Sequence, residues 1–143
     1  MKTVATLLDA KGSEVYSVGP DATVYEALEL MADKNVGALV IAEHNRLRGI
    51  LFERDYARKV ILRGRTSADT RVSEIMTTDV RTVAPTGTID DCMELMTAHR
   101  IRHLPVLDGD EIVGMISIGD VVKEAIAHLA SMVEQLESYI RGV

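Results

Sequence analysis

The chain contains 143 residues, a length typical of one compact domain. Apolar residues make up 47% of the sequence and aromatic residues only 3%, so we expect an aliphatic core and no surface that stacks nucleic-acid bases on aromatic rings. The net charge of −6 also argues against a protein that binds nucleic acid through its phosphates.

The predicted elements come in two similar sets, because a segment of roughly 41 residues occurs twice, 65 residues apart and without a gap. Residues 15–20 return as residues 80–85, and Asp55 returns as Asp120. Such a repeat predicts one small unit in two copies that pack together, so any cleft between them should occur twice. Because each copy alone is small, we expect the copies to share one hydrophobic core.

Each copy is predicted as strand, helix, strand, strand, helix, which gives an α/β (α+β) fold class. Thr23-Val-Tyr-Glu26 and Thr88-Ile-Asp-Asp91 both fit the capping box that begins a helix. Apolar residues then recur at i, i+3, i+4 and i+7, which predicts one buried face on each helix. The residues of these faces are Val24, Ala27, Leu28 and Met31, and Ile89, Cys92, Met93 and Met96.

Two short apolar runs follow this helix in each copy and predict a β-hairpin. They span residues 38–42 and 47–52 in the first copy, and residues 104–107 and 112–116 in the second. Pro105 cannot donate a backbone hydrogen bond, so we expect it at an edge strand or at a strand start.

The segments outside the copies are shorter and less regular. Residues 72–77 lead into the second copy much as residues 3–8 lead into the first, with three extra residues in the first case. The expected organisation is a first repeat with its lead-in at 1–63, a polar linker at 64–71, a second repeat at 72–125 and a C-terminal helix at 126–143.

The C-terminal helix should run to about Arg141 and carries an apolar stripe longer than a small core needs. One interpretation is that the stripe covers a partner subunit or the N-terminus, which predicts a homodimer. The other is that it packs on its own domain. The stripe consists of Leu129, Met132, Val133, Leu136 and Ile140.

The sharpest repeated motif runs from a glycine in a strand to an aspartate in the first turn of a helix, as Gly49 to Asp55 and as Gly114 to Asp120. The free N–H groups of a helix start favour an anion such as a phosphate. An ionised aspartate can accept both hydroxyls of a ribose. In the second copy, Ser117 could also hold a phosphate oxygen. The motif therefore predicts a nucleotide site.

A purely structural explanation competes with this one for Asp120, because Ser117 and Asp120 fit a capping box by themselves. Phe52 stands in the place of Ser117 in the first copy and cannot cap through its side chain, yet Asp55 is still present. That difference favours a ligand. A cation, Arg58 or Lys123, follows each aspartate by three residues.

Several other functions are not expected. The sequence holds no Ser-His-acid, CxxC or phosphate-loop pattern, so we predict no catalytic residues and no enzyme activity. His99 and His103 lie near Cys92 in the sequence, but the helix ends between the histidines, and we predict no metal site. The single cysteine and the lack of an apolar run long enough for a membrane span point to the cytosol, with no membrane partner.

Residues 72–77, 101–107 and 114–120, with their counterparts in the first copy, resemble cystathionine β-synthase (CBS) domains. The pair resembles a stand-alone Bateman module of the bacterial small-protein type. The resemblance implies two β-α-β-β-α repeats related by a pseudo-two-fold axis, a homodimer, and adenosine ligands in two clefts between the repeats. AMP, ADP, ATP, NAD and S-adenosylmethionine all fit that description.

The resemblance also implies which residues line the clefts, with the aspartates holding ribose, Arg102 reaching phosphate, and Arg54 and Arg58 compensating for the missing hydroxyl at Phe52. The first site would consist of Ser17, Val18, Val36, Gly37, Ala38, Leu39, Phe52, Glu53, Arg54, Asp55 and Arg58. The second would consist of Thr82, Val83, Ile101, Arg102, His103, Leu104, Pro105, Ser117, Ile118, Gly119 and Asp120.

The expected function is therefore a regulatory module that senses an adenosine nucleotide and passes its state to an effector protein, which the sequence does not identify. Two alternatives stay open: an oligomerisation scaffold or adaptor with degenerate sites, and a nucleotide-processing enzyme. Because Phe52 replaces a hydroxyl residue, the two clefts should differ in affinity.

Overall fold

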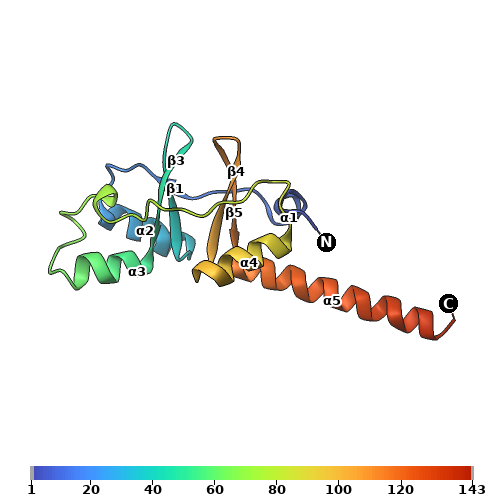
Figure 1. Cartoon of the computed structure of the whole chain (residues 1–143). Coiled ribbons are helices and arrows are strands. Elements are labelled where there is room, and N and C mark those ends of the chain that lie inside the picture. The colour runs from blue at the N-terminus through green and yellow to red at the C-terminus, as the bar shows by residue number, and fades with distance from the viewer. Residues whose placement is uncertain (1, 143) are drawn as a thin grey trace.

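The computed structural model describes residues 2–142 and shows a mixed α and β fold (Figure 1). Two β-hairpins stand side by side, and helices lie beneath and beside them. The elements in chain order are α1 (Val4–Lys11), β1 (Ser17–Val18), α2 (Val24–Lys34), β2 (Ala38–Glu43), β3 (Arg46–Phe52), α3 (Glu53–Tyr56), a π-helical turn (Ala57–Ile61), a 3-10 turn (Val72–Glu74), α4 (Ile89–His99), β4 (His103–Asp108), β5 (Glu111–Ser117) and α5 (Ile118–Ile140).

The helices of the two copies begin where the sequence predicts. Thr23 caps α2 by accepting the Glu26 N–H at 3.1 Å. Thr88 caps α4 in the same way, and Asp91 completes the capping box by accepting the Thr88 N–H at 2.9 Å. The full box predicted for the first copy is thus present only in the second, within residues 2–142.

The strands form two separate sheets. β2 pairs with β3 and β4 with β5, both antiparallel and both interrupted by a bulge at equivalent positions. β1 runs parallel to β2, but its counterpart in the second copy is reduced to one bridge between Val83 and Val106. Pro105 lies within β4, which pairs with β5 on one side and with Val83 alone on the other, where the Pro105 carbonyl accepts the Val83 N–H at 3.1 Å.

The hydrophobic residues form two clusters rather than the single shared core predicted from the sequence. The first contains α2, β2 and β3 residues together with Val72 and Ile75, which precede the second copy. The second contains α4, β4 and β5 residues together with Val4, Leu7 and Leu8 of α1. Each lead-in segment therefore completes the core of the other copy.

Matching backbone hydrogen bonds hold the two crossed lead-in segments. Val72 donates its N–H to the Ala22 carbonyl at 2.8 Å, and Val4 donates to the Gly87 carbonyl, also at 2.8 Å. The acceptors are 65 residues apart, whereas the donors are 68 apart, because the first lead-in is followed by three extra residues. This pairing makes the pseudo-two-fold relation between the copies visible in individual contacts.

The segment predicted as a polar linker, residues 64–71, lies against the start of α2. The carbonyl of Thr70 accepts the Val24 N–H at 2.8 Å, and that of Ser67 accepts the Tyr25 N–H at 3.0 Å. The buried Thr70 hydroxyl donates to the Thr66 carbonyl at 2.7 Å. The segment thus satisfies two of the N–H groups that a helix start leaves free.

α5 is one helix of 23 residues that begins in the second copy and projects away from both hairpins (Figure 1). Val121, near its start, is fully buried, whereas the apolar stripe from Leu129 to Ile140 is exposed. The interpretation that this stripe packs on its own domain is therefore wrong.

Candidate ligand-binding clefts

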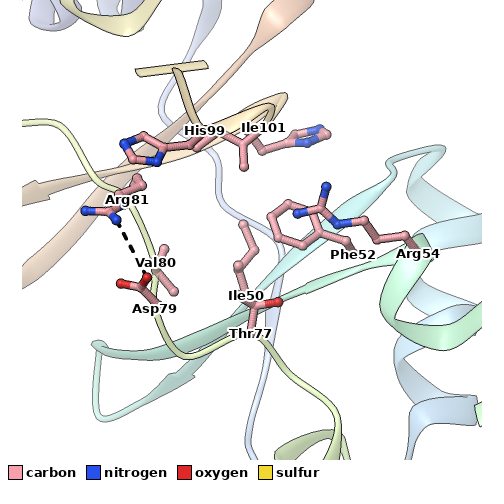
Figure 2. A pocket seen from close by; sticks show the side chains of 10 residues that line it. Ile50, Phe52, Arg54, Thr77, Asp79, Val80, Arg81, His99 and Ile101 are labelled. Atoms are coloured by element: carbon pink, nitrogen blue, oxygen red, sulfur yellow. Dashed lines mark ion pairs between the residues drawn. The ribbon is translucent and has the colours of Figure 1, made fainter. Parts of the chain in front are cut away.

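The structure contains two cavities that the repeat relates to each other. The first, here called the Phe52 cleft, measures about 190 Å³ and is lined by Ile50, Phe52, Arg54, Thr77, Asp79, Val80, Arg81, His99, Ile101 and His103 (Figure 2). The second, here called the Ser117 cleft, measures about 320 Å³ and is lined by Lys11, Glu14, Tyr16, Asn35, Val36, Gly37, Ala38, His103, Met115, Ser117 and Asp120.

Most of the lining residues correspond at the repeat distance of 65 residues. Phe52 corresponds to Ser117, and Ile101 to Val36. The prediction that a cleft between the copies should occur twice is therefore confirmed.

Each cleft takes its residues from both copies, in a combination that differs from the expected one. Ser117 and Asp120 of the second copy face Val36 and Ala38 of the first. Likewise, Phe52 of the first copy shares its cleft with residues 99–103 of the second. The two sets grouped by resemblance are thus exchanged between the clefts, because the copies pack face to face and each presents its strand end to the other.

Phe52 has a cation–π contact within its own copy and a tilted aromatic contact with the other copy in the Phe52 cleft. The guanidinium carbon of Arg54 lies 4.6 Å from the centre of the Phe52 ring, a distance typical of a cation–π contact. On the second copy, the His103 ring centre lies 6.4 Å from that of Phe52. Figure 2 shows Phe52 and Arg54 on one side of the cleft and His99 and Arg81 on the other.

A second hollow of about 360 Å³ adjoins the Phe52 cleft and adds two more arginines, Arg100 and Arg102. Arg81 is 3.6 Å from Asp79. Within residues 2–142 the structure records no ion pair for Arg54, Arg100 or Arg102, so these three guanidinium groups are available to an anion. In a chain with a net charge of −6, such a group of cations is a local exception.

His103 lines both clefts and lies on β4, where the two copies meet. Burial lowers the pKa of His103 below its ordinary value of 6.5, and the nearby cations Lys11 and Arg102 lower it further, against the raising effect of Asp120 and Glu53. The imidazole is therefore neutral at neutral pH in the unliganded protein. A bound anion would favour its protonation.

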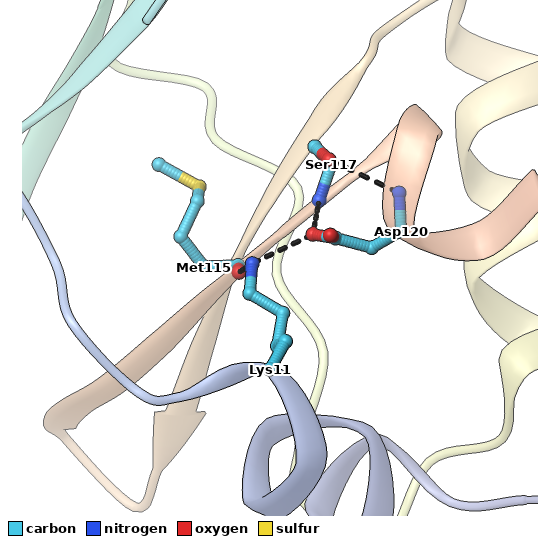
Figure 3. A network of polar contacts seen from close by, with 4 residues as sticks. All are labelled: Lys11, Met115, Ser117 and Asp120. Atoms are coloured by element: carbon cyan, nitrogen blue, oxygen red, sulfur yellow. Dashed lines mark hydrogen bonds and ion pairs between the residues drawn. The ribbon is translucent and has the colours of Figure 1, made fainter. Parts of the chain in front are cut away.

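A compact polar network closes one side of the Ser117 cleft (Figure 3). Ser117 accepts the Asp120 N–H at 3.2 Å, and Asp120 Oδ2 accepts the Ser117 N–H at 2.9 Å. Lys11, at the end of α1, donates to the same Oδ2 at 2.6 Å and to the Met115 carbonyl at 2.7 Å. The capping box foreseen as the structural explanation for Ser117 and Asp120 is thus present.

The network leaves Asp120 able to accept further bonds. Partial burial raises the pKa of Asp120, but the hydrogen bonds from Lys11 and Ser117 outweigh it, so the pKa lies below its usual value of 3.8. The carboxylate is ionised at neutral pH. Among the described residues, both recorded hydrogen bonds to the Asp120 carboxylate go to Oδ2. Oδ1 therefore remains able to accept a bond from a ligand in the cleft.

Asp55, the counterpart of Asp120, is placed differently. Its Oδ2 accepts the Phe52 N–H at 2.9 Å, its Oδ1 lies 3.1 Å from Lys59 Nζ, and the Thr77 hydroxyl is 3.3 Å from both oxygens. The side chain is 5% exposed and does not line the Phe52 cleft. The argument that Asp55 must have a ligand because Phe52 cannot cap is therefore wrong: Asp55 bonds the backbone N–H of Phe52, which every residue but proline offers.

The repeated glycines are explained by packing of the lead-in segments. A Cβ atom on Gly49 would lie 2.8 Å from both the Met76 sulfur and the Thr77 carbonyl oxygen. A Cβ atom on Gly114 would lie 2.7 Å from both terminal carbons of Leu8. Each lead-in segment thus crosses a hairpin at a point where only glycine fits.

The expected site residues divide into two groups. Those that line the clefts or the adjoining hollow are Val36, Gly37, Ala38, Phe52, Glu53, Arg54, Ile101, Arg102, His103, Ser117 and Asp120. Those that line none of these three are Ser17, Val18, Leu39, Asp55, Arg58, Thr82, Val83, Leu104, Pro105, Ile118 and Gly119. Of the latter, five are buried: Leu39, Asp55, Val83, Leu104 and Pro105.

Sequence reasoning missed several lining residues, above all Lys11, Tyr16 and Arg81. Tyr16 and Arg81 occupy equivalent places in the repeat, so the repeat distance could have identified them together. Lys11 lies between the first lead-in and the first copy, where three extra residues interrupt the correspondence, so the repeat distance does not identify it.

Two further observations concern metals and membranes. Across residues 2–142, no group of three or more His, Cys, Asp and Glu side chains is arranged to hold a metal ion. Cys92 is a buried free thiol whose pKa burial raises to about 11. None of the described helices combines the length and apolar character needed to cross a bilayer.

Comparison with known proteins identifies both copies. A family model of the CBS domain matches residues 10–61 and residues 72–127. A curated relative, the mitochondrial CBS domain-containing protein CBSX3 of Arabidopsis thaliana, is 44% identical over an alignment of 138 residues that covers 93% of this chain. The chain spans 66% of the length of that relative.

Solved structures agree in fold. A protein with CBS domains from Burkholderia ambifaria is 53% identical and superposes with a TM-score of 0.84, covering 88% of this chain and 95% of that protein. A hexameric CBS-CP12 protein from bloom-forming cyanobacteria is 27% identical, with a TM-score of 0.74, and covers 85% of this chain and 70% of that one. Oligomeric relatives of this fold thus exist.

Proposed function

Because the chain belongs to the CBS-domain family and carries two such domains in tandem, we propose that it is a regulatory module that binds adenosine nucleotides in the Phe52 and Ser117 clefts. The observation that carries this proposal is the pair of equivalent clefts, each lined by both domains. A ligand in either cleft would contact both domains and could change how they pack. Such coupling between a ligand and a packing state is what a sensor requires.

In the Phe52 cleft, we assign the phosphates to the arginines. Ile50, Phe52 and Ile101 offer an apolar wall for a base, while Arg54, Arg100 and Arg102 face the outer hollow. Arg100, the C-cap of α4, lines this hollow and has a positive φ of 52°, which is uncommon for arginine. This arrangement favours a nucleotide with two or three phosphates, such as ADP or ATP.

In the Ser117 cleft, we assign the ribose to Asp120. Its free Oδ1 could accept a ribose hydroxyl, with the Ser117 hydroxyl near a phosphate. Among the described residues that line this cleft, Lys11 is the one lysine or arginine, and it is already bonded to Asp120. The cleft therefore suits AMP or another adenosyl ligand of low charge better than ATP, and NAD and S-adenosylmethionine remain candidates.

The test is calorimetric titration with ATP, ADP, AMP, NAD and S-adenosylmethionine. Arg54→Ala should weaken ATP binding about ten- to a hundredfold, since a hydrogen bond to a charged group is worth roughly 1.5–3 kcal/mol. Asp120→Ala should weaken AMP binding by a similar factor. Arg63→Ala, an exposed arginine outside both clefts, serves as the matched control. Lack of heat with every ligand would contradict nucleotide binding.

The alternatives make different predictions. A scaffold with degenerate clefts would bind none of these nucleotides but would keep its oligomeric state. An enzyme would convert the nucleotide, which chromatography of the ligand after incubation would reveal. We also propose that the protein acts as a homodimer, supported by the exposed stripe on α5, and that it regulates an effector protein in the cytosol, where a free buried thiol such as Cys92 is stable.

A further inference from the structure

The exposed apolar side of α5 is long and continuous, and no other element within residues 2–142 covers it. Its residues from Val122 onward are between 46% and 83% exposed, although all of them are large and apolar. Figure 1 shows that this part of α5 extends beyond both hairpins. An exposed apolar strip of this kind marks an interaction surface.

The spacing of the strip is that of a coiled coil. Its main positions are 122, 126, 129, 133, 136 and 140, which alternate steps of four and three residues. That alternation is the heptad repeat, in which positions a and d face a partner helix. The a positions hold Ile126, Val133 and Ile140, and the d positions hold Val122, Leu129 and Leu136.

The residue types at these positions specify the partner. β-Branched residues at a with leucine at d favour two parallel strands. All three a residues are β-branched, and two of the three d residues are leucine. We infer that α5 pairs with α5 of a second copy as a parallel, in-register, two-stranded coiled coil.

Charge is compatible with this arrangement. From residue 125 to residue 140 the a, d and g positions carry no charged side chain, and the g positions are Ala125, Met132 and Tyr139. Glu137, at an e position, would face Met132 of the second copy, because g and the following e meet across a parallel seam. No pair of like charges is brought together.

The inference rests on the proposed homodimer but not on nucleotide binding, and it adds an orientation and a register. The CBS-domain match ends at residue 127, so most of the seam lies outside the family match. In a parallel pair the CBS domains of both copies lie at the same end of the coiled coil. Each α5 begins at Ile118, with Ser117 as its cap and Asp120 in its first turn, so the helix that forms the coiled coil starts at the Ser117 cleft.

Cysteine cross-linking tests orientation and register together. In a parallel, in-register pair, Leu129→Cys and Leu136→Cys each face their own copy, whereas an antiparallel pair can bring at most one of these positions onto itself. Ser131→Cys, at the outward f position of the same exposed helix, is the matched control. The parent protein controls for Cys92, which is buried and has a thiol pKa of about 11.

Under mild oxidation, both leucine variants should form disulfide-linked dimers more than about tenfold faster than Ser131→Cys and the parent, because a disulfide needs its two Cβ atoms about 4 Å apart. Equal rates for Leu129→Cys, Leu136→Cys and Ser131→Cys would overturn the inference, as would linkage at only one of the two leucine positions.

A second variant separates failure of the seam from failure of the homodimer. Light scattering should show a dimer for the parent and for Ser138→Glu, and a monomer with an unchanged circular-dichroism spectrum for Leu136→Glu. A parent that is a monomer would overturn the homodimer itself. A Leu136→Glu variant that stays a dimer would overturn only the coiled coil. The CBS domains would then form the dimer interface.

Discussion

Gly49→Ala should destabilise the ligand-free protein more than Gly114→Ala. Neither glycine has a positive φ, so neither is needed for its backbone conformation. In Gly49→Ala the new methyl group would meet the Thr77 carbonyl oxygen at 2.8 Å, and that oxygen accepts the Ile50 N–H at 2.9 Å. No rotamer change can relieve a clash with backbone, so the bridge between Ile50 and Thr77 must open.

The expected loss follows from these contacts. Overpacking costs about 1–3 kcal/mol, and the two hydrogen bonds between Ile50 and Thr77 contribute about 0.5–1.5 kcal/mol each, so Gly49→Ala should lose about 2–6 kcal/mol of unfolding free energy. In Gly114→Ala the atoms nearest to the methyl group all belong to the Leu8 side chain, with its two terminal carbons at 2.7 Å and Cγ at 3.3 Å. That side chain can shift, and we expect a loss of about 1–3 kcal/mol.

Urea denaturation without ligand measures both losses. Gly37→Ala is the control, because a Cβ atom there has nothing within 4 Å and the residue has no positive φ. It should leave stability unchanged or raise it by up to about 1 kcal/mol. A further variant, Leu8→Ala with Gly114→Ala, should be less destabilised than the sum of its single changes, since the two sites are in contact. If Gly49→Ala were as stable as the parent, the glycine would not be explained by the crossing segment.

Three further predictions concern the clefts. ATP binding should strengthen as pH falls from 8 toward the lowered pKa of His103, because bound phosphate favours the imidazolium, and His103→Gln should flatten that dependence in calorimetry. Asp120→Asn should lower the unfolding free energy at pH 7 by about 1–2 kcal/mol through its bonds to Lys11 and Ser117, and the difference from the parent should vanish in urea melts as pH falls through the lowered pKa of Asp120. Phe52→Ser should raise AMP affinity about tenfold, and equally tight sites in the parent would show that Phe52 does not distinguish the clefts.

Local patterns predicted the parts of the fold that depend on local physics. Thr23 and Thr88 begin helices because a hydroxyl satisfies N–H groups three residues on, and the hairpins follow from apolar runs separated by polar turns. The repeat itself predicted that a cleft occurs twice. These conclusions need no knowledge of which segments meet in space.

The crossing of the lead-in segments could not be predicted in the same way. Val4, Leu7 and Leu8 are an apolar group in any arrangement, and their spacing does not say which copy they cover. The bond between Lys11 and Asp120 joins residues 109 apart in the sequence, and no periodicity relates them. The same gap explains part of the misreading of Asp55, because its partner Thr77 becomes visible only once the second lead-in lies against β3. Its other partners, the Phe52 N–H and Lys59, are local in sequence.

The contacts at the start of α5 could couple a ligand in the Ser117 cleft to the proposed coiled coil of α5. Two ion pairs tie the N-terminal segment to the first turns of α5: Lys11 to Asp120 at 2.6 Å, and Lys2 to Glu124 at 3.1 Å. A ribose that bonds Asp120 would share its carboxylate with Lys11 and so weaken the hold of α1, whose Leu7 and Leu8 belong to the second core. Because α5 is one continuous helix, a shift at its start changes the angle at which its far end meets a partner. Coupling of this kind is reciprocal. A dimer that fixes the direction of α5 would therefore also change the affinity of the Ser117 cleft for its ligand.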